Sequence, residues 1–259
     1  MITSSSPQVL VEQDQRLLSI TLYRPERKNA LSLSMYNALA EIIQAANDDA
    51  SIRVLVIKGH DEFFTSGNDL MDFMNDPVIR DDHPTVKFMN ALTQSAKPVV
   101  AIVRGHAIGI GTTLLMHCDL VFVADDARLQ LPFVNLGLSA EYASSLLLPL
   151  IIGKAKATEL LLLGEPFSGR DAANWGLVNA ALPWDELDDY ANDKIQRLLH
   201  QPPNAVRRCK ALMSLAQKDT IQAILRAEYQ AFAEGLGSEE CKESVTAFFE
   251  KRAPDFSRF

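Results

Sequence analysis

Two turns of the chain carry residue types that could hold an anionic oxygen. In segment 63–70, Ser66, Gly67, Asn68 and Asp69 follow a predicted strand, and Asp69 could cap a short helix that begins there. A turn of small residues before a helix leaves backbone N–H groups free, and such groups bind anionic oxygens favourably. On residue types alone, a plain surface turn is the favoured explanation of this segment.

The second turn, segment 103–113, also joins a predicted strand to a predicted helix. Gly105, Gly109 and Gly111 would let the backbone approach a ligand closely. The spacing lacks the third glycine of a dinucleotide-binding turn, so a dinucleotide site is not expected. His106 could act as a base, although a histidine beside a glycine turn is more often structural.

Glu141 is the third candidate, and its carboxylate could act as a general acid or base. It lies just before an apolar run at 146–148, which we interpret as part of a helix. A carboxylate in this position is usually a first-turn residue that interacts favourably with the helix dipole. Its position alone therefore does not establish a catalytic role.

Strands and helices alternate over most of the chain ahead of residue 139. The predicted strands are 9–12, 17–23, 52–57, 98–103 and 119–124, and the predicted helices are 31–46, 86–93 and 109–116. This alternation indicates an α/β fold. Later segments are nearly all helical, and Ser168 with Asp171 predicts a capping box. We predict a core over 1–198 and a C-terminal helical region over 199–259 that forms an oligomer interface.

The composition excludes several other classes of protein. The chain has 259 residues and is 47% hydrophobic, which is typical of a globular protein. Its net charge of −8 argues against non-specific nucleic-acid binding. Its three cysteines, Cys118, Cys209 and Cys241, are widely spaced and predict neither a disulfide framework nor a metal site. We find no apolar run near the roughly 20 residues needed to cross a membrane. Residues 1–7 do not resemble a secretion signal, so we expect a cytoplasmic protein.

Taken in order, the motifs of this chain resemble those of the enoyl-CoA hydratase/isomerase (crotonase) superfamily. The matching segments are 24–31, 64–70, 97–101, 105–111 followed by 118–119, 164–178 and 247–254. Each motif is weak alone, but the ordered set covers nearly the whole chain. The resemblance implies a spiral of ββα units with C-terminal helices that assemble trimers. It also implies an acyl-CoA thioester as substrate and a homotrimer or hexamer.

The resemblance further implies an oxyanion hole made by the backbone N–H groups of Asn68 and Ile110. Preorganised donors of this kind contribute about 3 kcal/mol each to stabilising a developing enolate. Backbone donors do not depend on the side chain, so isoleucine can occupy such a position. No separate cofactor is implied, because CoA is part of the substrate.

Binding of CoA and the acyl chain is assigned by the same resemblance. The implied substrate-binding residues are Arg24, Lys28, Ala30, Ser66, Gly67, Asn68, Asp69, Leu70, Gly109 and Phe133. We expect Arg24 and Lys28 to bind the phosphates, with Lys87 and Lys97 as weaker candidates; each could instead be an ordinary surface cation. The expected apolar lining of the acyl pocket is Phe73, Met74, Met89 and Phe133, although helical Met and Phe residues are more often core.

The departures from the family pattern select among its reactions. Hydratases resemble one another in carrying two glutamates, and the corresponding positions here are Thr113 and Phe133. Addition of water needs a base for the water and an acid for the α-carbon, so hydration is disfavoured. The Δ3,Δ2-enoyl-CoA isomerases place one glutamate in a Pro-Glu-Gly-x-Ser-Ser stretch, which segment 140–145 resembles with Ala140 and Tyr142 in place of Pro and Gly.

Glu141 thereby becomes the expected catalytic residue of an isomerase that moves a proton from C2 to C4 of a 3-enoyl-CoA. Burial would raise the pKa of its carboxyl and a helix start would lower it, so the net direction stays open. Two alternatives also stay open. One is another crotonase reaction, such as hydration or thioester hydrolysis, and the other is a non-catalytic acyl-CoA-binding protein.

Overall fold

Two sheets built from alternate strands of the chain form the centre of the fold. The computed structural model describes residues 2–60, 62–69, 71–72 and 80–259. The first sheet has the order β1 (Val9–Asp14), β2 (Leu17–Leu22), β3 (Val54–Gly59), β5 (Val99–Val103), β7 (Leu120–Ala124) and β10 (Ala180–Leu182). Only its first pair is antiparallel; the remaining neighbours run parallel. The predicted α/β class is thus confirmed, and the predicted strands 9–12 and 17–23 pair with each other as a hairpin.

The second sheet contains the strands that lead into the candidate site. Its order is β4 (Phe63–Thr65), β6 (His106–Ile108), β8 (Arg128–Gln130) and β9 (Phe167–Ser168). Along the chain, β3, β5 and β7 belong to the first sheet, and each is followed by one strand of the second sheet and then by helix. Each repeat of the chain therefore adds one strand to the first sheet, one strand to the second sheet and then a helix. This arrangement is the expected ββα spiral.

Apolar composition explains why β5 occupies the middle of the first sheet. All five residues of its sequence VVAIV are buried, as expected for a parallel strand covered on both faces. On one side of the sheets, α1 (Leu33–Asp48) packs against α3 (Pro84–Thr93). Helix α1 begins where the Ser32 hydroxyl accepts the Met35 N–H at 3.3 Å.

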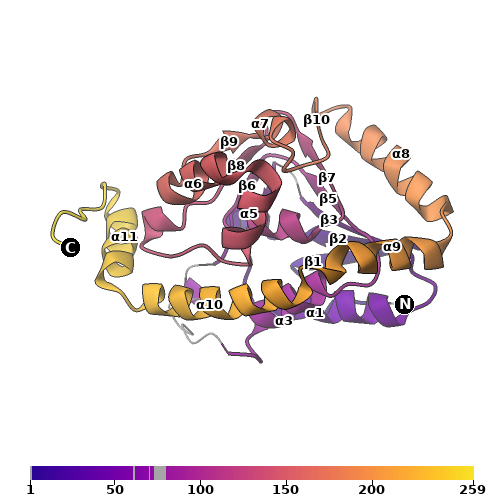
Figure 1. The fold of residues 1–259 in the computed structure, drawn as a ribbon, viewed down its shortest axis with the longest axis horizontal. Coiled ribbons are helices and arrows are strands. Elements are labelled where there is room, and N and C mark those ends of the chain that lie inside the picture. Colours follow the sequence, from indigo (N-terminus) through magenta and orange to yellow (C-terminus); the bar gives the residue numbers. More distant parts are fainter. Residues whose placement is uncertain (1, 61, 70, 73–79) are drawn as a thin grey trace.

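The second half of the chain supplies most of the remaining helices. These are α5 (Ser144–Ile152), α6 (Lys154–Leu163), α7 (Gly169–Asn174), α8 (Leu187–His200), α9 (Pro203–Leu215), α10 (Lys218–Leu236) and α11 (Glu239–Glu250). In Figure 1, α8 flanks the first sheet, and α10 runs below α5 toward α11 and the C-terminus. The predicted capping box at Ser168 and Asp171 is present and starts α7.

Two details differ from the expectations. The predicted boundary after residue 198 lies inside α8, which ends at His200. The segment after 139 also contains strands β9 and β10, which have two and three residues. Strands this short have no periodicity that a sequence pattern could reveal.

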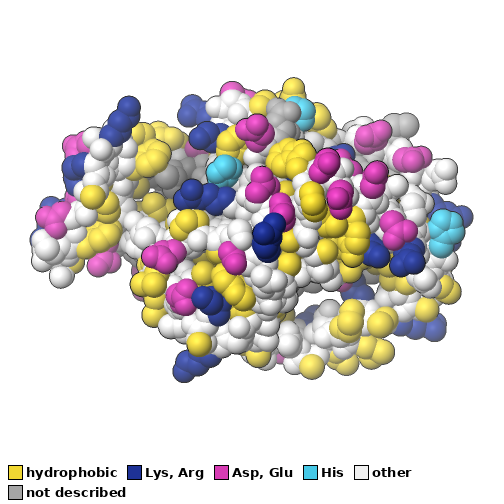
Figure 2. Space-filling view, turned by 90° about the horizontal axis from the view of Figure 1, so that it is seen from above, with side chains coloured by type: hydrophobic (Ala, Val, Ile, Leu, Met, Phe, Trp, Pro, Cys, Tyr) yellow, Lys and Arg dark blue, Asp and Glu magenta, His cyan; other side chains and the backbone are white. Residues whose placement is uncertain are grey.

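The surface seen in Figure 2 carries acidic and basic side chains interspersed with apolar ones. Helix α8 contributes Asp188 and Asp189 in its first turn and Arg197 in its last turn, where each charge interacts favourably with the helix dipole. Of the helices in the described part of the chain, none is long and apolar enough to cross a membrane.

Candidate active site

The first candidate oxyanion loop follows β4 and is held by the segment ahead of α1. The Leu31 N–H donates to the Gly67 carbonyl at 2.8 Å, and the Asp69 N–H donates to the Leu31 carbonyl at 2.9 Å. Asn68 lies between these two bonds, so its own N–H faces away from Leu31. Among the described residues, no backbone acceptor is found for that N–H.

The second candidate loop follows β6 and ends at the start of α4 (Ile110–Thr113). Gly109 adopts φ 57°, and its carbonyl accepts the N–H groups of Thr112 and Thr113 at 2.8 and 3.0 Å. Ile110 is the first residue of the helix, where an N–H has no partner within the helix itself. No acceptor for it is found among the residues that the structure describes.

Two glycines allow these loops to pack directly against each other. Gly67 has φ 97°, and a Cβ added there would lie 2.9 Å from the Ile108 carbonyl oxygen. A Cβ on Gly111 would lie 2.5 Å from the Thr65 Cγ2 atom. The loops that carry Asn68 and Ile110 are therefore neighbours, as an oxyanion hole built from both would need.

Glu141 is buried beside α4. Glu141 is only 4% exposed, and its Oε1 atom accepts a hydrogen bond from the Thr113 hydroxyl at 2.5 Å. Its Oε2 atom is buried and has no hydrogen-bond partner among the described residues. Thr113 ends the short helix that Ile110 begins, so the carboxyl lies close to the second loop.

Burial determines the protonation of this carboxyl. It raises the pKa of Glu141 to about 8, against the lowering effect of the Thr113 hydroxyl, and the charge of Glu228 raises it further. The sequence left open the net direction of the pKa shift of Glu141. The pKa is raised, because burial outweighs the opposing effects. A carboxyl with this pKa can both remove and return a proton near neutral pH.

Tyr36 of α1 binds the first loop. Its buried hydroxyl donates a short hydrogen bond to the Asn68 side-chain oxygen. The pKa of Tyr36 is raised, first by burial and then by the charge of Glu141. Sequence reasoning missed Tyr36, since its only signal was a place on the buried face of a helix.

The segment that resembles the family's opening motif supports the first loop. The Arg24 guanidinium forms an ion pair with Asp69 at 2.8 Å and donates to the Ala30 carbonyl at 3.1 Å. The Lys28 carbonyl accepts the Ser66 N–H at 3.0 Å. The Lys28 ammonium lies 5.4 Å from the centre of the Phe63 ring. Binding of CoA phosphates by Arg24 and Lys28 stays a prediction.

The remaining candidates divide into those beside the loops and those elsewhere. A Cβ on Gly109 would lie 3.9 Å from the Phe133 ring, so Phe133 borders the second loop. Met89 is buried, and its carbonyl accepts the Tyr142 hydroxyl at 2.9 Å. The predicted residues Leu70, Phe73 and Met74 lie outside the described residues.

Lys97 is not a surface cation. It is 2% exposed, and its ammonium donates short hydrogen bonds to the Ala46 and Asp49 carbonyls at the end of α1. Burial lowers its pKa, and its charge stabilises the helix C-terminus. The expectation that Lys97 binds phosphate is therefore wrong, whereas Lys87 is exposed on α3 and stays a prediction.

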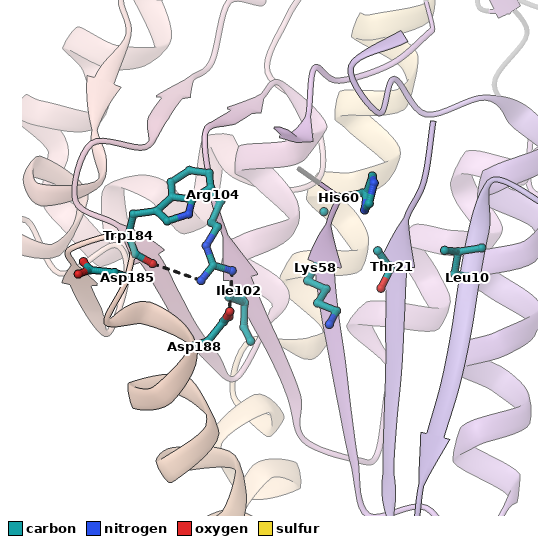
Figure 3. A pocket seen from close by; sticks show the side chains of 10 residues that line it. Leu10, Thr21, Lys58, His60, Ile102, Arg104, Trp184, Asp185 and Asp188 are labelled. Atoms are coloured by element: carbon teal, nitrogen blue, oxygen red, sulfur yellow. Dashed lines mark hydrogen bonds and ion pairs between the residues drawn. The ribbon is translucent and has the colours of Figure 1, made fainter. Parts of the chain in front are cut away.

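His106 and a nearby cavity lie apart from these residues. The His106 ring stacks on Phe63 with centres 5.0 Å apart. A cavity of about 640 Å³ opens nearby over the first sheet, and Figure 3 shows Arg104 in it, bonded to the Trp184 carbonyl and to Asp188. Neither Glu141 nor either loop donor lines this cavity.

Comparisons with known proteins agree with this arrangement. The family model described as "Enoyl-CoA hydratase/isomerase" matches residues 12–258. The chain is 32% identical over 250 residues to the 2,3-dehydroadipyl-CoA hydratase of Escherichia coli strain K12, with 96% of this chain and 98% of that protein covered. It is 31% identical to the enoyl-CoA delta isomerase 2 of Rattus norvegicus, with 94% of this chain but 64% of that protein covered.

A similar solved structure is that of Pseudomonas aeruginosa OdaA. It is 47% identical to the chain, has a TM-score of 0.91 and covers 94% of this chain and 99% of its own. The names of the relatives include both hydratases and isomerases of CoA thioesters. The names therefore agree on the substrate class but not on the reaction.

Proposed function

The chain belongs to the enoyl-CoA hydratase/isomerase family, and we propose that within it the protein is a Δ3,Δ2-enoyl-CoA isomerase. The observation that carries this proposal is the buried carboxyl of Glu141 beside the second loop, with the Asn68 and Ile110 N–H groups lacking an acceptor among the described residues. One acid-base group suits a reaction in which one proton moves between two carbons of the same molecule.

The reaction begins with the thioester carbonyl of a 3-enoyl-CoA bound to the N–H groups of Asn68 and Ile110. Ionised Glu141 removes a proton from C2. The electron pair of the broken C–H bond forms a C1=C2 double bond, and the carbonyl π pair moves onto the thioester oxygen, which gives a dienolate conjugated with the C3=C4 double bond. The two N–H groups stabilise this dienolate. Protonated Glu141 then donates the proton to C4, and the double bond ends between C2 and C3.

The surroundings of Glu141 support this sequence of steps. Its pKa of about 8 makes it a stronger base, once ionised, than a solvent-exposed carboxylate. Thr113 donates to one carboxyl oxygen and leaves the other without a partner among the described residues. That second oxygen is the one we assign to proton transfer.

Hydration is the main rival, because several relatives are named hydratases. Its two-group chemistry would need a second acid or base. By the family resemblance those groups would stand at positions 113 and 133, and here they are Thr113 and Phe133. Neither side chain ionises near neutral pH, which favours the isomerase.

We infer a homotrimer or hexamer and a cytoplasmic location from the resemblance and the composition. Direct measurement of the mass in solution tests the first of these.

A substrate panel tests the proposed reaction. Conjugation of the double bond with the thioester adds ultraviolet absorbance that the unconjugated 3-enoyl thioester lacks. We expect the protein to generate this absorbance from 3-enoyl-CoA and to leave 2-enoyl-CoA nearly unchanged. Loss of absorbance from 2-enoyl-CoA, with no gain from 3-enoyl-CoA, would instead establish a hydratase. Absence of both changes, with retained acyl-CoA binding, would establish a non-catalytic binder.

A further inference from the structure

The turn that carries Glu141 has a backbone conformation that its own residues do not favour. Tyr142 and Ala143 adopt φ 55° and 56°, two consecutive left-handed residues that are not glycine. Each such residue costs on the order of 1 kcal/mol or more, so outside contacts must hold the turn. Ala143 is also the N-cap of α5, and its side chain has no atom that can accept an N–H.

Glu228 of α10 supplies the missing acceptor from the C-terminal part of the chain. Its carboxylate is buried; Oε2 accepts the Ala143 N–H, and Oε1 accepts the Ser145 N–H at 3.0 Å and the Ser145 hydroxyl at 2.6 Å. The Ser144 N–H between them donates to the Glu141 carbonyl at 3.1 Å. Three successive N–H groups therefore have acceptors, two of them on Glu228.

Tyr142 holds the same turn from its other side. Its ring is fully buried and stacks on His117 with ring centres 3.8 Å apart. The His117 Nε2 lies 2.8 Å from the Tyr142 carbonyl oxygen, and the Tyr142 hydroxyl donates to the Met89 carbonyl at 2.9 Å. These contacts restrain Tyr142, but they leave the N–H groups at the start of α5 to Glu228.

We propose that Glu228 is a positioning residue that fixes the catalytic turn through the backbone of Ala143 and Ser145 and so aims Glu141 at the substrate. This inference rests on the proposed function of Glu141. Both oxygens of Glu228 are engaged by the turn, so Glu228 acts through Glu141 rather than on the substrate. Figure 1 shows α10 passing below α5, which is the arrangement that brings the two together.

Electrostatics supports the same pairing. After burial, the negative charge of Glu228 is the cause that raises the pKa of Glu141. The charge of Glu141 also acts on the buried Tyr36 and Tyr142 and on the partly buried Tyr229, and the pKa values of all three are raised. His117, which stacks on Tyr142, has its pKa lowered to about 4 by burial. Near neutral pH these groups are neutral. Burial raises the pKa of Glu228 itself, against the lowering effect of its bonds with Ser145 and Ala143, and its ionised form supplies the charge that acts on Glu141.

The substitution Glu228→Gln tests the proposal in the full-length protein. Glutamine keeps the size, but its amide nitrogen cannot accept an N–H. We expect kcat for 3-enoyl-CoA to fall on the order of 10²-fold, the size typical of a misplaced catalytic group, while KM changes little. Loss of the negative charge should also move the acid limb of the kcat/KM profile to lower pH. A variant with the wild-type kcat and the wild-type profile would overturn the proposal.

Two further variants control for folding. Glu234→Gln changes an exposed acidic residue of the same helix and should leave kcat and the pH profile as in the wild type. Ser145→Ala removes only the hydroxyl bond to Glu228 and should lower kcat by less than Glu228→Gln, with the acid limb in place. If Glu228→Gln fails to fold, Ser145→Ala decides: a lowered kcat supports the proposal, and a wild-type kcat overturns it.

A titration without turnover separates this proposal from the proposed function. The Glu141 carboxyl carbon can be followed by ¹³C NMR, with Glu141→Gln used to assign its signal. We expect a lower pKa in Glu228→Gln than in the wild type, even if the substrate panel shows another reaction. Identical pKa values would overturn the coupling, whatever the reaction proves to be.

Discussion

The carboxyl of Glu141 must be ionised to remove a proton from carbon, yet its surroundings favour the protonated form. Burial next to a single hydroxyl donor raises its pKa to about 8. Only about a tenth of the free protein is then competent at pH 7, since one pH unit below the pKa leaves one ionised group in about ten. In return, the ionised group is more basic and removes a proton from carbon at less cost.

This pKa predicts a rise of activity with pH. We expect kcat/KM for 3-enoyl-CoA to increase about tenfold per pH unit well below pH 8 and to level off above it, because the ionised form of Glu141 is the base. The profile is measured by following conjugated thioester at limiting substrate. A limb near pH 4.5, the range of an ordinary glutamate, or a flat profile from pH 6 to 9 would argue against a buried base.

Tyr142 shows what the sequence could and could not reveal at this scale. The resembling isomerase motif has glycine at its position, and the structure gives Tyr142 a positive φ that glycine adopts easily. The sequence identified the substitution, but not that a stacked His117 and a buried Glu228 support the turn. Those contacts join residues 25 and 85 positions apart, and no local pattern encodes such pairings.

Among the elements, the two strand-to-helix turns determine whether the backbone donors meet. Both follow strands of the second sheet, β4 and β6, which are paired in parallel. Parallel neighbours end at the same edge of a sheet, so the turns after them are brought together. The glycines Gly67 and Gly111 allow the final close approach of the two loops. The sequence predicted that the backbone at Gly111 approaches a ligand, which stays a prediction.

Gly67→Ala should therefore damage the site more than the fold. The added Cβ would meet the Ile108 carbonyl oxygen at 2.9 Å, at φ 97°, so the first loop must move. We expect kcat to fall on the order of 10²-fold, as for loss of one oxyanion donor. The matched control is Gly176→Ala, where φ is 80° but no atom lies within 4 Å of the added Cβ.

Steady-state kinetics with thermal denaturation separates the two variants. Both should lose some stability, since both place alanine at positive φ. Only Gly67→Ala should lose turnover. Equal activity in both variants would mean that the close packing of the two loops is not needed for the reaction.

Across the whole molecule, the sequence predicted what depends on local pattern and on the ordered motifs. Long periodic segments such as α1 and apolar runs such as β5 were identified because burial dictates their residue types. The predicted boundary at 198 falls near the end of α8, which continues to His200, because the composition does not change within that helix. The prediction for Lys97 was wrong because a lysine is usually a surface cation. Here its ammonium is buried against two carbonyl groups at the end of α1, a contact that no local pattern indicates.

The C-terminal part of the chain contributes to the site as well as to the outer surface. Glu228 reaches the start of α5 from α10, and Lys210 of α9 bonds to Asp119 at 2.6 Å beside β7. These long-range contacts tie the last helices to the ββα core. They also explain why a boundary drawn for the core alone misses part of what supports Glu141.

The substitution Glu141→Gln tests the central claim most directly, since it removes one acid-base group and little else. We expect it to abolish formation of conjugated thioester from 3-enoyl-CoA while acyl-CoA binding, measured by calorimetry, stays intact. The variant should fold at least as well as the wild type between about pH 5 and 8, because in this range folding must keep Glu141 protonated whereas the unfolded chain ionises it. Retained isomerase turnover in this variant would contradict a mechanism in which Glu141 carries the proton from C2 to C4.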